Sequence, residues 1–552
     1  MDVLVAIEAF DVPDRLAIKA RRIVTVPARP VSADVVADLR AHIPRWVGVV
    51  GPPGDALAAA VDLHTAGLAV RLYTDAVPEE ALPAGIAVEP ITDSGPPMEI
   101  ADSLVELIGN TPLVRLDRMG RELSCTLAAK LEYLNPGGSV KDRPALTMVI
   151  AAEQAGLLGP GGTIVEPTSG NTGTGLAIVA ARRGYRCIFT MPDKIAKEKV
   201  DLLRAYGAEV VVCPSAVEPD HPDSYYRTAR RLNDTTPGAF MPNQYDNQAN
   251  PAAHVATTGP EIWRQTAGRI THFVASIGTG GTISGVGRYL KSQNPDIQII
   301  GADPEGSVYS GGSGRPYLVE GIGEDFWPTT YDPTVADRVV KVSDRDSFLT
   351  ARKVTTEEGI LAGGSCGTAV WAAVEIGRTL GPEAVVVVLL PDSGRGYLSK
   401  VYNDEWMADH GFLRSAGDTV ESVLAAKGAS LPRLVHVHPD ETVRSAIAIL
   451  REYGVSQMPV VKAEPPVALA EVVGTVSDRH LLEMALGDQG IIDRPLGEVM
   501  DPPLPMIGTG ETVDVAAARL SEASAVLVID QGSPTGILTR SDLLDFLARP
   551  KL

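Results

Sequence analysis

Cysteine is scarce in this chain. Only four of its 552 residues are cysteine, and they stand far apart at Cys125, Cys187, Cys213 and Cys366. None belongs to a Cys-x-x-Cys pair. This pattern excludes a disulfide framework and a cysteine-based zinc module, and it is typical of proteins in a reducing compartment. We therefore expect a cytoplasmic protein without a metal site.

Positive charge and long apolar runs are also in short supply. Lys and Arg number 49 against 69 Asp and Glu, which gives a net charge of −20. This acidic excess argues against a nucleic-acid-binding surface. No apolar run is long enough to span a bilayer, and the N-terminal residues lack the pattern of a secretory signal. We expect small-molecule partners, with no nucleic acid and no membrane.

The length and composition indicate several globular domains. A hydrophobic content of 45 % excludes general disorder, and 552 residues exceed one ordinary core. We predict a small N-terminal α/β extension over residues 1–97, a second domain over 98–410, a linker over 411–430 and a third domain over 431–552. The first block contains a Gly-Pro-Pro-Gly turn that lacks the spacing and the lysine of a phosphate loop, so we assign this block no function.

The second block alternates continuous apolar segments with helical patterns. Such segments predict parallel strands covered by helices on both faces, an α/β fold that binds ligands at the carboxyl ends of its strands. The predicted strands are Ile164–Glu166, Cys187–Thr190, Val210–Val212, His272–Ser276, Ile297–Ala302 and Val385–Leu390.

Glycine-rich turns fall at or close to such strand ends. Asn135–Arg143 places Lys141 where a helix can begin, and Gly278–Thr282 lies between a predicted strand and a predicted helix. A lysine in a semi-buried site can form a Schiff base. A helix that starts in a Gly-rich turn can bind a phosphate through free N–H groups and the helix dipole. Together these features suggest an enzyme that uses pyridoxal phosphate.

Two further segments supply polar groups. The turn around Asn171 offers Thr168, Ser169, Gly170 and Thr172, which suit a substrate carboxylate, while Asn171 could bond a ring hydroxyl. Simple helix capping would be the favoured interpretation of these residues if they stood alone. Ser393 follows the last predicted strand and could contact a ring nitrogen without protonating it. A weaker electron sink of this kind suits β-elimination and replacement.

The segment from about Leu104 to Met407 resembles the pyridoxal-phosphate-dependent β-replacement family of cystathionine β-synthases and cysteine synthases, which has fold type II. The motifs that carry the resemblance are Gly109–Leu113, Asn135–Arg143, the turn around Asn171, Gly278–Thr282, Glu320–Gly323 and Pro391–Ser393. Within the family, these motifs and the third domain resemble the cystathionine β-synthase branch.

The resemblance implies a role for each matching residue. Lys141 would bind the cofactor covalently and move the α-proton, Asn171 would meet the ring hydroxyl, and Ser393 would face the ring nitrogen. The phosphate would be held by Gly278, Thr279, Gly280, Gly281 and Thr282. The substrate carboxylate would be bound by Thr168, Ser169, Gly170, Thr172 and Gln244. Tyr245 and Glu320 would serve the second substrate.

The implied reaction joins L-serine, or an O-activated serine, to L-homocysteine and gives cystathionine. The family also implies a homodimer or homotetramer. Animal members carry a haem-binding N-terminal segment with a Cys and a His, whereas residues 1–97 contain no cysteine, so we expect no haem.

Residues 431–552 contain a weak internal repeat in which each half reads helix, strand, strand, helix, and the halves should pack together. This region resembles the tandem CBS (Bateman) module attached to these enzymes. Thr539 and Asp542 match the adenosyl-ligand pattern, and S-adenosylmethionine is the implied ligand. In the first repeat His480 stands where the ribose acid would be, so at most one intact site is expected. A module that only aids oligomerisation remains an alternative.

Three other functions stay open at this point. A cysteine synthase would use O-acetylserine and sulfide. A serine or threonine dehydratase would eliminate the β-hydroxyl group and add no second substrate. A protein of another class would sense nucleotides through its third domain and carry an inactive catalytic fold. An intact Lys141, phosphate turn and Ser393 argue against this last hypothesis.

Overall fold

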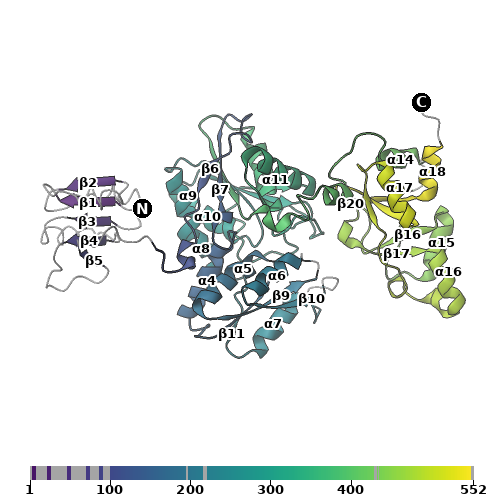
Figure 1. The fold of residues 1–552 in the computed structure, drawn as a ribbon, viewed down its shortest axis with the longest axis horizontal. Coiled ribbons are helices and arrows are strands. Elements are labelled where there is room, and N and C mark those ends of the chain that lie inside the picture. Colours follow the sequence, from purple (N-terminus) through teal and green to yellow (C-terminus); the bar gives the residue numbers. More distant parts are fainter. Residues whose placement is uncertain are drawn as a thin grey trace. The chain divides into compact units, whose positions relative to one another are not determined.

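The computed structural model describes residues 100–168, 170–193, 195, 197–214, 221–427, 432 and 434–548, together with the backbone of five strands within residues 1–99. The chain divides into two compact units, Met1–Asp102 and Ser103–Leu552. In the first unit, the strands form a parallel sheet of order β2-β1-β3-β4-β5 (Figure 1). They are β1 Val3–Ile7, β2 Arg22–Val26, β3 Val47–Val50, β4 Val70–Thr74 and β5 Ile86–Pro90. The helical part of the predicted N-terminal α/β extension lies outside the described residues.

The larger sheet of the second unit has the order β14-β13-β12-β15-β7-β6, and all its pairs are parallel except β6 with β7. Its strands are β6 Leu113–Arg115, β7 Thr126–Leu131, β12 His272–Ser276, β13 Gln298–Pro304, β14 Arg338–Val342 and β15 Val385–Leu390. A smaller parallel sheet has the order β10-β9-β8-β11. Its strands are β8 Thr163–Pro167, β9 Arg186–Pro192, β10 Glu209–Cys213 and β11 Ala239–Phe240. All six continuous strands predicted from the sequence are confirmed.

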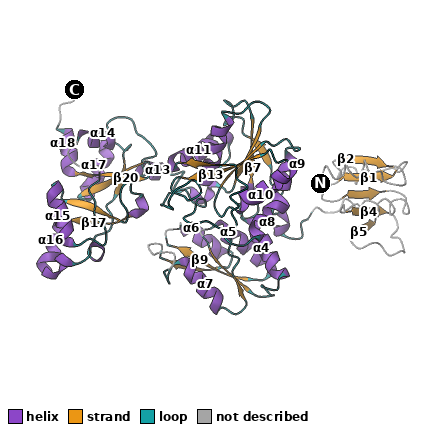
Figure 2. Cartoon of the chain, turned by 180° about the vertical axis from the view of Figure 1, so that it is seen from behind, coloured by secondary structure: helices purple, strands orange, loops and turns teal. Residues whose placement is uncertain are grey.

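Helices flank the strands of both sheets (Figure 2). They are α4 Asp142–Gln154, α5 Asn171–Arg183, α6 Lys197–Ala205, α7 Tyr225–Thr235, α8 Ala249–Ala253, α9 Gly259–Gln265, α10 Gly281–Gln293, α11 Asp344–Glu358, α12 Gly364–Gly377 and α13 Asp404–Asp409. Short 3-10 turns include η1 Leu104–Leu107, η2 Glu132–Leu134 and η4 Gly394–Tyr397, and the π-helical turn η3 His254–Thr258 joins α8 to α9.

The continuous apolar strands of the larger sheet are buried on both faces. Phe273 and Ala275 belong to one core cluster, whereas Val274 between them belongs to another. In β15, Val387 and Val388 divide between the same two clusters. Each such fully buried side chain contributes about 1.5–3 kcal/mol relative to an exposed one. The predicted doubly covered sheet is confirmed.

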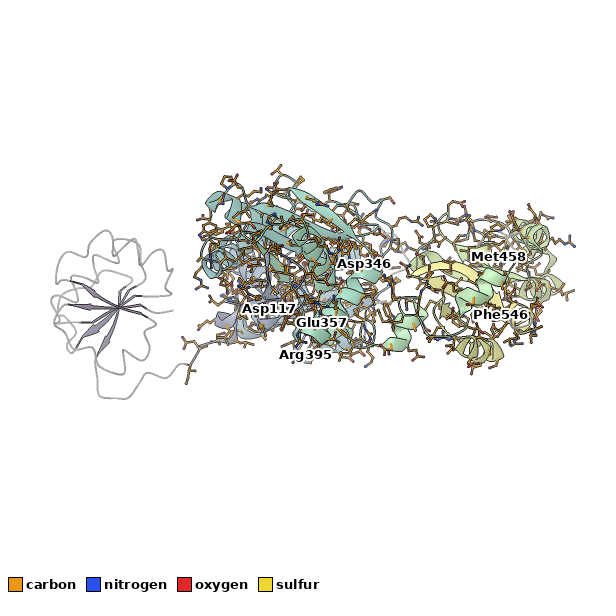
Figure 3. All side chains as sticks on the ribbon, turned by 90° about the horizontal axis from the view of Figure 1, so that it is seen from above. Asp117, Asp346, Glu357, Arg395, Met458 and Phe546 are labelled. Carbon is orange, nitrogen blue, oxygen red and sulfur yellow. The ribbon has the colours of Figure 1, made fainter. Side chains whose placement is uncertain are left out.

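The C-terminal repeat folds as the sequence predicts. Its first half contains α15 Val443–Tyr453, β16 Gln457–Val461, β17 Val472–Ser477 and α16 Asp478–Gly487, and its second half contains α17 Val513–Glu522, β19 Ala525–Asp530, β20 Ser533–Thr539 and α18 Arg540–Leu547. A short strand, β18 Met506–Gly508, pairs with β19. Met458, which is labelled in Figure 3, belongs to the first half. Its side chain is fully buried. One cluster joins the halves, with Val461 and Val467 from the first against Leu527 and Ile529 from the second.

The segment that the sequence suggests as a linker, residues 411–430, contains a helix, α14 Val420–Ala426. Val420 and Val423 are buried in one cluster with Ile507 and Val528 of the second half-repeat. Their burial makes this segment part of the C-terminal module. Among the described residues, none of the helices combines the length and the apolar character that a membrane crossing would need.

Candidate active site

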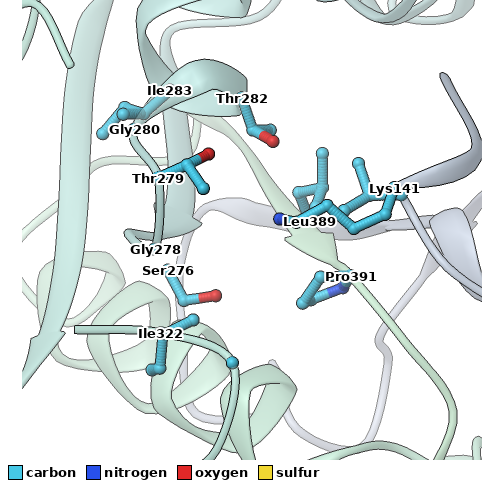
Figure 4. Close-up of a pocket in the computed structure, with 12 residues that line it drawn as sticks. Lys141, Ser276, Gly278, Thr279, Gly280, Thr282, Ile283, Ile322, Leu389 and Pro391 are labelled. Carbon is cyan, nitrogen blue, oxygen red and sulfur yellow. The ribbon is translucent and has the colours of Figure 1, made fainter. Parts of the chain in front are cut away.

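A pocket opens where two strands of the larger sheet end. Ser276 ends β12, and Leu389 and Pro391 lie at the end of β15. The pocket lining combines these strand ends with the two Gly-rich turns singled out in the sequence (Figure 4). It consists of Val140, Lys141, Ser276, Gly278, Thr279, Gly280, Thr282, Ile283, Gly321, Ile322, Leu389 and Pro391.

Lys141 lies directly before α4, and its side chain extends into the pocket toward the loop that carries Thr279 and Thr282 (Figure 4). The neighbouring Val140 N–H donates to the carbonyl of Pro391 at 2.8 Å, which fixes this turn against the end of β15. Burial lowers the pKa of the Lys141 ammonium, although Asp392 and Glu324 oppose the shift. A partly neutral amine at this position can act as nucleophile and as base.

The loop from Gly278 to Thr282 requires glycine for steric reasons. Gly280 has φ +82°, and a Cβ there would lie 2.4 Å from the Cβ of Tyr331. A Cβ on Gly281 would lie 2.1 Å from Oδ1 of Asn250. Asn250 also donates from Nδ2 to the Thr279 hydroxyl at 3.1 Å. The loop begins the 13-residue helix α10, whose first N–H groups and dipole favour an anion.

The turn before α5 brings part of the predicted carboxylate set together. Thr172 donates its hydroxyl to Oε1 of Gln244 at 2.6 Å. The hydroxyl of Thr168 accepts from the N–H groups of Gly170 and Gly173, both at 3.2 Å, so Thr168 does cap this turn. Gly170 has φ +145°, a conformation that L side chains rarely adopt. Ser169 lies outside the described residues.

Sequence reasoning missed Asp392, a buried carboxyl beside Asn171. Nδ2 of Asn171 donates to its Oδ2 at 2.9 Å, and the hydroxyl of Tyr397 donates to the same oxygen at 2.7 Å. Burial raises the pKa of Asp392, whereas these two hydrogen bonds lower it. Asp392 thereby fixes the orientation of the Asn171 amide. The motif Pro391-Asp392-Ser393 is the sequence signal that points to it.

Ser393 is half-buried and precedes the turn η4, where its hydroxyl accepts from the N–H of Arg395 at 3.3 Å. Within the described part of the chain, the residues that line the pocket do not include Ser393. A second serine, Ser365, is buried in the first turn of α12. Its neighbour Cys366 lies with Sγ 3.2 Å from the carbonyl oxygen of Asp392. The role of Ser393 at the ring nitrogen stays a prediction.

Glu320 lies between two lysines that come from different parts of the chain. Its carboxylate accepts from Nζ of Lys199 and from Nζ of Lys400. Burial alone would raise the pKa of Glu320, but Lys199 and Lys400 lower it below its usual value. Nζ of Lys199 also lies 4.5 Å from the ring centroid of Tyr397. Glu320 is therefore connected, through Lys199 and Tyr397, to Asp392.

Tyr245 stands in an aromatic cluster. Its ring makes edge contacts with Tyr226 and Phe326, with centroids 6.5 and 5.3 Å apart. Burial raises the pKa of the Tyr245 hydroxyl, so it remains protonated.

The half-buried Glu324 has its pKa raised to about 8 by burial and by Asp325.

A buried ionic network that sequence reasoning also missed begins close to Lys141 in the chain. Arg143, two residues after Lys141, donates to Oε1 of Glu261 at 2.8 Å and to Oε2 of Glu132 at 2.7 Å. Lys130, whose side chain is fully buried, donates to Oε2 of Glu261 at 2.6 Å. Because each charge is paired and hydrogen-bonded, the network anchors the segment that carries Lys141.

In the C-terminal module, Thr539 and Asp542 form a capping box at the start of α18. Oδ2 of Asp542 accepts from the N–H and the hydroxyl of Thr539, at 2.7 and 2.6 Å. The same oxygen lies 2.6 Å from Nζ of Lys427, which follows α14. In the first repeat, His480 instead has Nε2 3.1 Å from the carbonyl of Val499.

Comparison with known proteins gives the family. A profile described as "Pyridoxal-phosphate dependent enzyme" matches residues 104–392, and a "CBS domain" profile matches 428–487 and 496–549. The chain is 41 % identical to "Cystathionine beta-synthase" of Oryctolagus cuniculus over 475 residues, which are 82 % of this chain and 85 % of the relative. The corresponding protein of Dictyostelium discoideum is 35 % identical, over 82 % of this chain and 93 % of its own length.

Two further relatives match mainly the catalytic part. "Probable cysteine synthase" of Bacillus subtilis (strain 168) is 48 % identical over 306 residues, 55 % of this chain and 97 % of the relative. The crystal structure of O-ureido-L-serine synthase superimposes with a TM-score of 0.53 at 39 % identity, over 56 % of this chain and 99 % of that one. With its lysine, its phosphate-type loop and its paired CBS domains, the chain belongs to the cystathionine beta-synthase family of pyridoxal-phosphate-dependent enzymes.

Proposed function

We propose that this protein catalyses a β-replacement in which L-serine, or an O-activated serine, and L-homocysteine form cystathionine. The observation that carries the proposal is the Lys141 amine, which extends toward the Gly278–Thr282 loop in one pocket. The similarity to cystathionine beta-synthases over 82 % of the chain supports it independently.

The pocket fits pyridoxal phosphate on the chemistry of its donors. The Cβ clashes at Gly280 and Gly281 mean that these two positions carry no side chain, which leaves the backbone N–H groups of this loop close to the pocket. Lys141 would hold the cofactor covalently, the Gly278–Thr282 loop its phosphate, and Asn171 its ring hydroxyl. When bound, the cofactor supplies an electron sink for the negative charge that develops at the substrate α-carbon.

The protein's own groups would move the proton and hold the substrates. Nζ of Lys141 takes the α-proton of the first substrate, the β-hydroxyl or acyloxy group leaves, and the thiol sulfur of the second substrate adds at the β-carbon. Nζ then returns the proton. The lowered pKa of Lys141 keeps part of the amine neutral for this task.

Substrate orientation would come from the turn before α5 and from the mouth of the pocket. The hydroxyl of Thr172, held by Gln244, suits the carboxylate of the first substrate together with Ser169 and the other members of that turn. Glu320 would receive the ammonium group of homocysteine, which has to compete with Lys199 and Lys400 for the same carboxylate. Tyr245 would line the side of the second substrate.

A cysteine synthase that uses O-acetylserine and sulfide is the second candidate. The 48 % identity to a probable cysteine synthase over 306 residues favours it. That relative corresponds to 55 % of this chain, so the shared part does not extend to the paired CBS domains. The candidates differ in the leaving group and in the sulfur nucleophile.

Product analysis by mass spectrometry separates these functions. Purified protein with pyridoxal phosphate is given serine plus homocysteine, or O-acetylserine plus sulfide, with Lys141→Ala as the control. Cystathionine that depends on Lys141 supports the proposal, and cysteine from the second pair alone assigns a cysteine synthase. Release of pyruvate without either product identifies a dehydratase. The absence of any Lys141-dependent product would favour the nucleotide-sensing protein with an inactive catalytic fold.

We propose further that a serine hydroxyl faces the ring nitrogen, and two residues compete for this role. Ser393 was selected by its motif, whereas Ser365 is more deeply buried and begins a helix packed against Asp392. Ser393→Ala and Ser365→Ala, compared by cofactor absorbance and by rate, assign the contact to the residue whose loss changes both.

Regulation and assembly complete the proposal. An adenosyl ligand, with S-adenosylmethionine as the first candidate, would bind beside Thr539 and Asp542. It would have to displace Lys427, which now contacts Asp542. We propose a cytoplasmic homodimer or homotetramer, which light scattering on the purified full chain would test.

A further inference from the structure

Two histidines and one glutamate converge at one edge of the first half-repeat, far from the pocket in the sequence. His436 and His438 flank Val437, which pairs in parallel with Val460 of β16. Because side chains alternate along an extended segment, residues two apart point to the same side. Glu464 follows β16 in the next loop. One ligand atom from each of the three residues lies within 4.8 Å of the others.

The hydrogen bonds of the two imidazoles set which nitrogen faces the cluster. Nδ1 of His438 lies 2.9 Å from the carbonyl oxygen of Val461, and Nδ1 of His436 lies 3.3 Å from that of Leu434. A carbonyl oxygen can only accept, so each Nδ1 carries the hydrogen. In a neutral imidazole the opposite nitrogen, Nε2, then has a free lone pair. Metal-binding histidines have their tautomer fixed by such a hydrogen bond.

The distances match those between ligands of one metal ion. Nε2 of His438 lies 3.3 Å from Oε1 of Glu464, and Nε2 of His436 lies 3.4 Å from its Oε2. Ligands about 2.0–2.1 Å from a tetrahedral zinc ion are separated by roughly 3.4 Å. Without protons or a cation between them, two nitrogen lone pairs and a carboxylate would repel one another at this separation.

We propose that His436, His438 and Glu464 form a binding site for a divalent transition-metal ion, with zinc as the first candidate. Two imidazoles and one carboxylate suit zinc and its neighbours in the series, whereas calcium and magnesium prefer all-oxygen sites. The side chains of His436 and His438 are largely buried, at 18 % and 23 % exposed, while Glu464 is 80 % exposed. The ion would therefore have a fixed histidine pair, an exposed carboxylate and an open fourth position for water.

The site departs from the expectation drawn from cysteine spacing, because it uses no cysteine. By binding His436, His438 and Glu464, the ion would link the segment before α15 to the loop after β16. That loop continues to Glu471, which accepts from Nη2 of Arg315 in the catalytic domain at 2.6 Å. Bound metal would thus restrain one end of a loop whose other end contacts the catalytic domain.

Zinc binding to the full-length, tag-free holoenzyme tests the site. Zinc is titrated at pH 8 in competition with a chromophoric chelator, for wild type and for His436→Asn, His438→Asn and Glu464→Gln. We expect one tight site per chain, and at least about a tenfold rise in Kd for each variant, as the loss of groups around a metal ion commonly causes. His480→Asn is the matched control, because His480 lies in the same half-repeat and faces one carboxylate, Asp501, at 3.5 Å.

The same samples loaded with cobalt give a readout that does not depend on affinity. Strong visible d–d absorption in wild type, lost in His438→Asn and kept in His480→Asn, supports a low-coordinate site made of these ligands. Equal zinc affinity in all the proteins, or no competition with the chelator by wild type, overturns the proposal. Glu464→Gln is exposed and conservative, so a failure to fold would not obscure its result.

Discussion

The buried ionic network of Lys130, Glu132, Arg143 and Glu261 gives the sharpest stability prediction. Glu261 accepts from Nζ of Lys130 at 2.6 Å and from Arg143 at 2.8 Å, and its side chain is 10 % exposed. In Glu261→Gln the fully buried Lys130 ammonium loses its nearest counter-charge, while its bonds to the Thr111 carbonyl and to Gln265 remain. Removing one partner of a buried pair costs about 3–5 kcal/mol.

The assay is the free energy of unfolding in denaturant, followed by bound-cofactor absorbance as a probe of the catalytic domain. A loss of about 3–5 kcal/mol corresponds to a fall in Tm of roughly 5–8 °C for a domain of this size. Asp201→Asn is the control, because the Lys197–Asp201 pair is exposed at 85 % and 46 % and such pairs contribute at most about 1 kcal/mol. The double variant Lys130→Met with Glu261→Gln should recover part of the loss, since no unpaired ammonium is left.

The pH dependence gives a second reading of the same network. Burial opposes ionisation, but hydrogen bonds and charge from Arg143 and Lys130 lower the pKa of Glu261 to about 2. A folded pKa below the unfolded one means that the stabilisation is present above about pH 4.5 and is lost as the pH falls toward about 2. Glu261→Gln should flatten this part of the stability profile. A variant within about 1 kcal/mol of wild type, with an unchanged acid profile, would refute the reasoning.

Three further predictions concern ligands. Gly281→Ala should abolish cofactor binding, measured by absorbance after gel filtration, because its Cβ would meet Asn250 at 2.1 Å; retained binding would refute the steric argument. Glu320→Gln should raise the KM for homocysteine at least about tenfold with a smaller effect on the KM for serine, since a carboxylate–ammonium contact contributes about 1.5–3 kcal/mol; equal changes for both substrates would argue against this role. Lys427→Met should lower the Kd for S-adenosylmethionine, measured by calorimetry, because it frees Asp542 from its ion pair. An unchanged Kd would argue against a ligand contact at Asp542.

Much of the fold could be predicted from the sequence because the relevant constraints are local. The continuous apolar segments became parallel strands, since a strand buried on both faces needs an apolar side chain at every position. The repeat in residues 431–552 could be predicted because the order of helices and strands in each half is also a local property of the sequence. The segment 411–430 was the exception: its composition suggests a linker, and only the burial of Val420 and Val423 against the module makes it part of a core.

The sequence by itself determined the local elements of the site, namely Lys141 after a Gly-rich turn and the Gly278–Thr282 loop before α10. Their backbone conformations depend on residues next to one another, and glycine is required wherever a Cβ would clash. Only the tertiary structure decided the pairings: Asn171 with Asp392, 221 positions apart; Glu320 with Lys199 and Lys400; and Lys427 with Asp542. A side chain can meet any residue that packing brings to it, so charge and hydrogen-bond partners distant in the sequence are fixed by the folded chain alone.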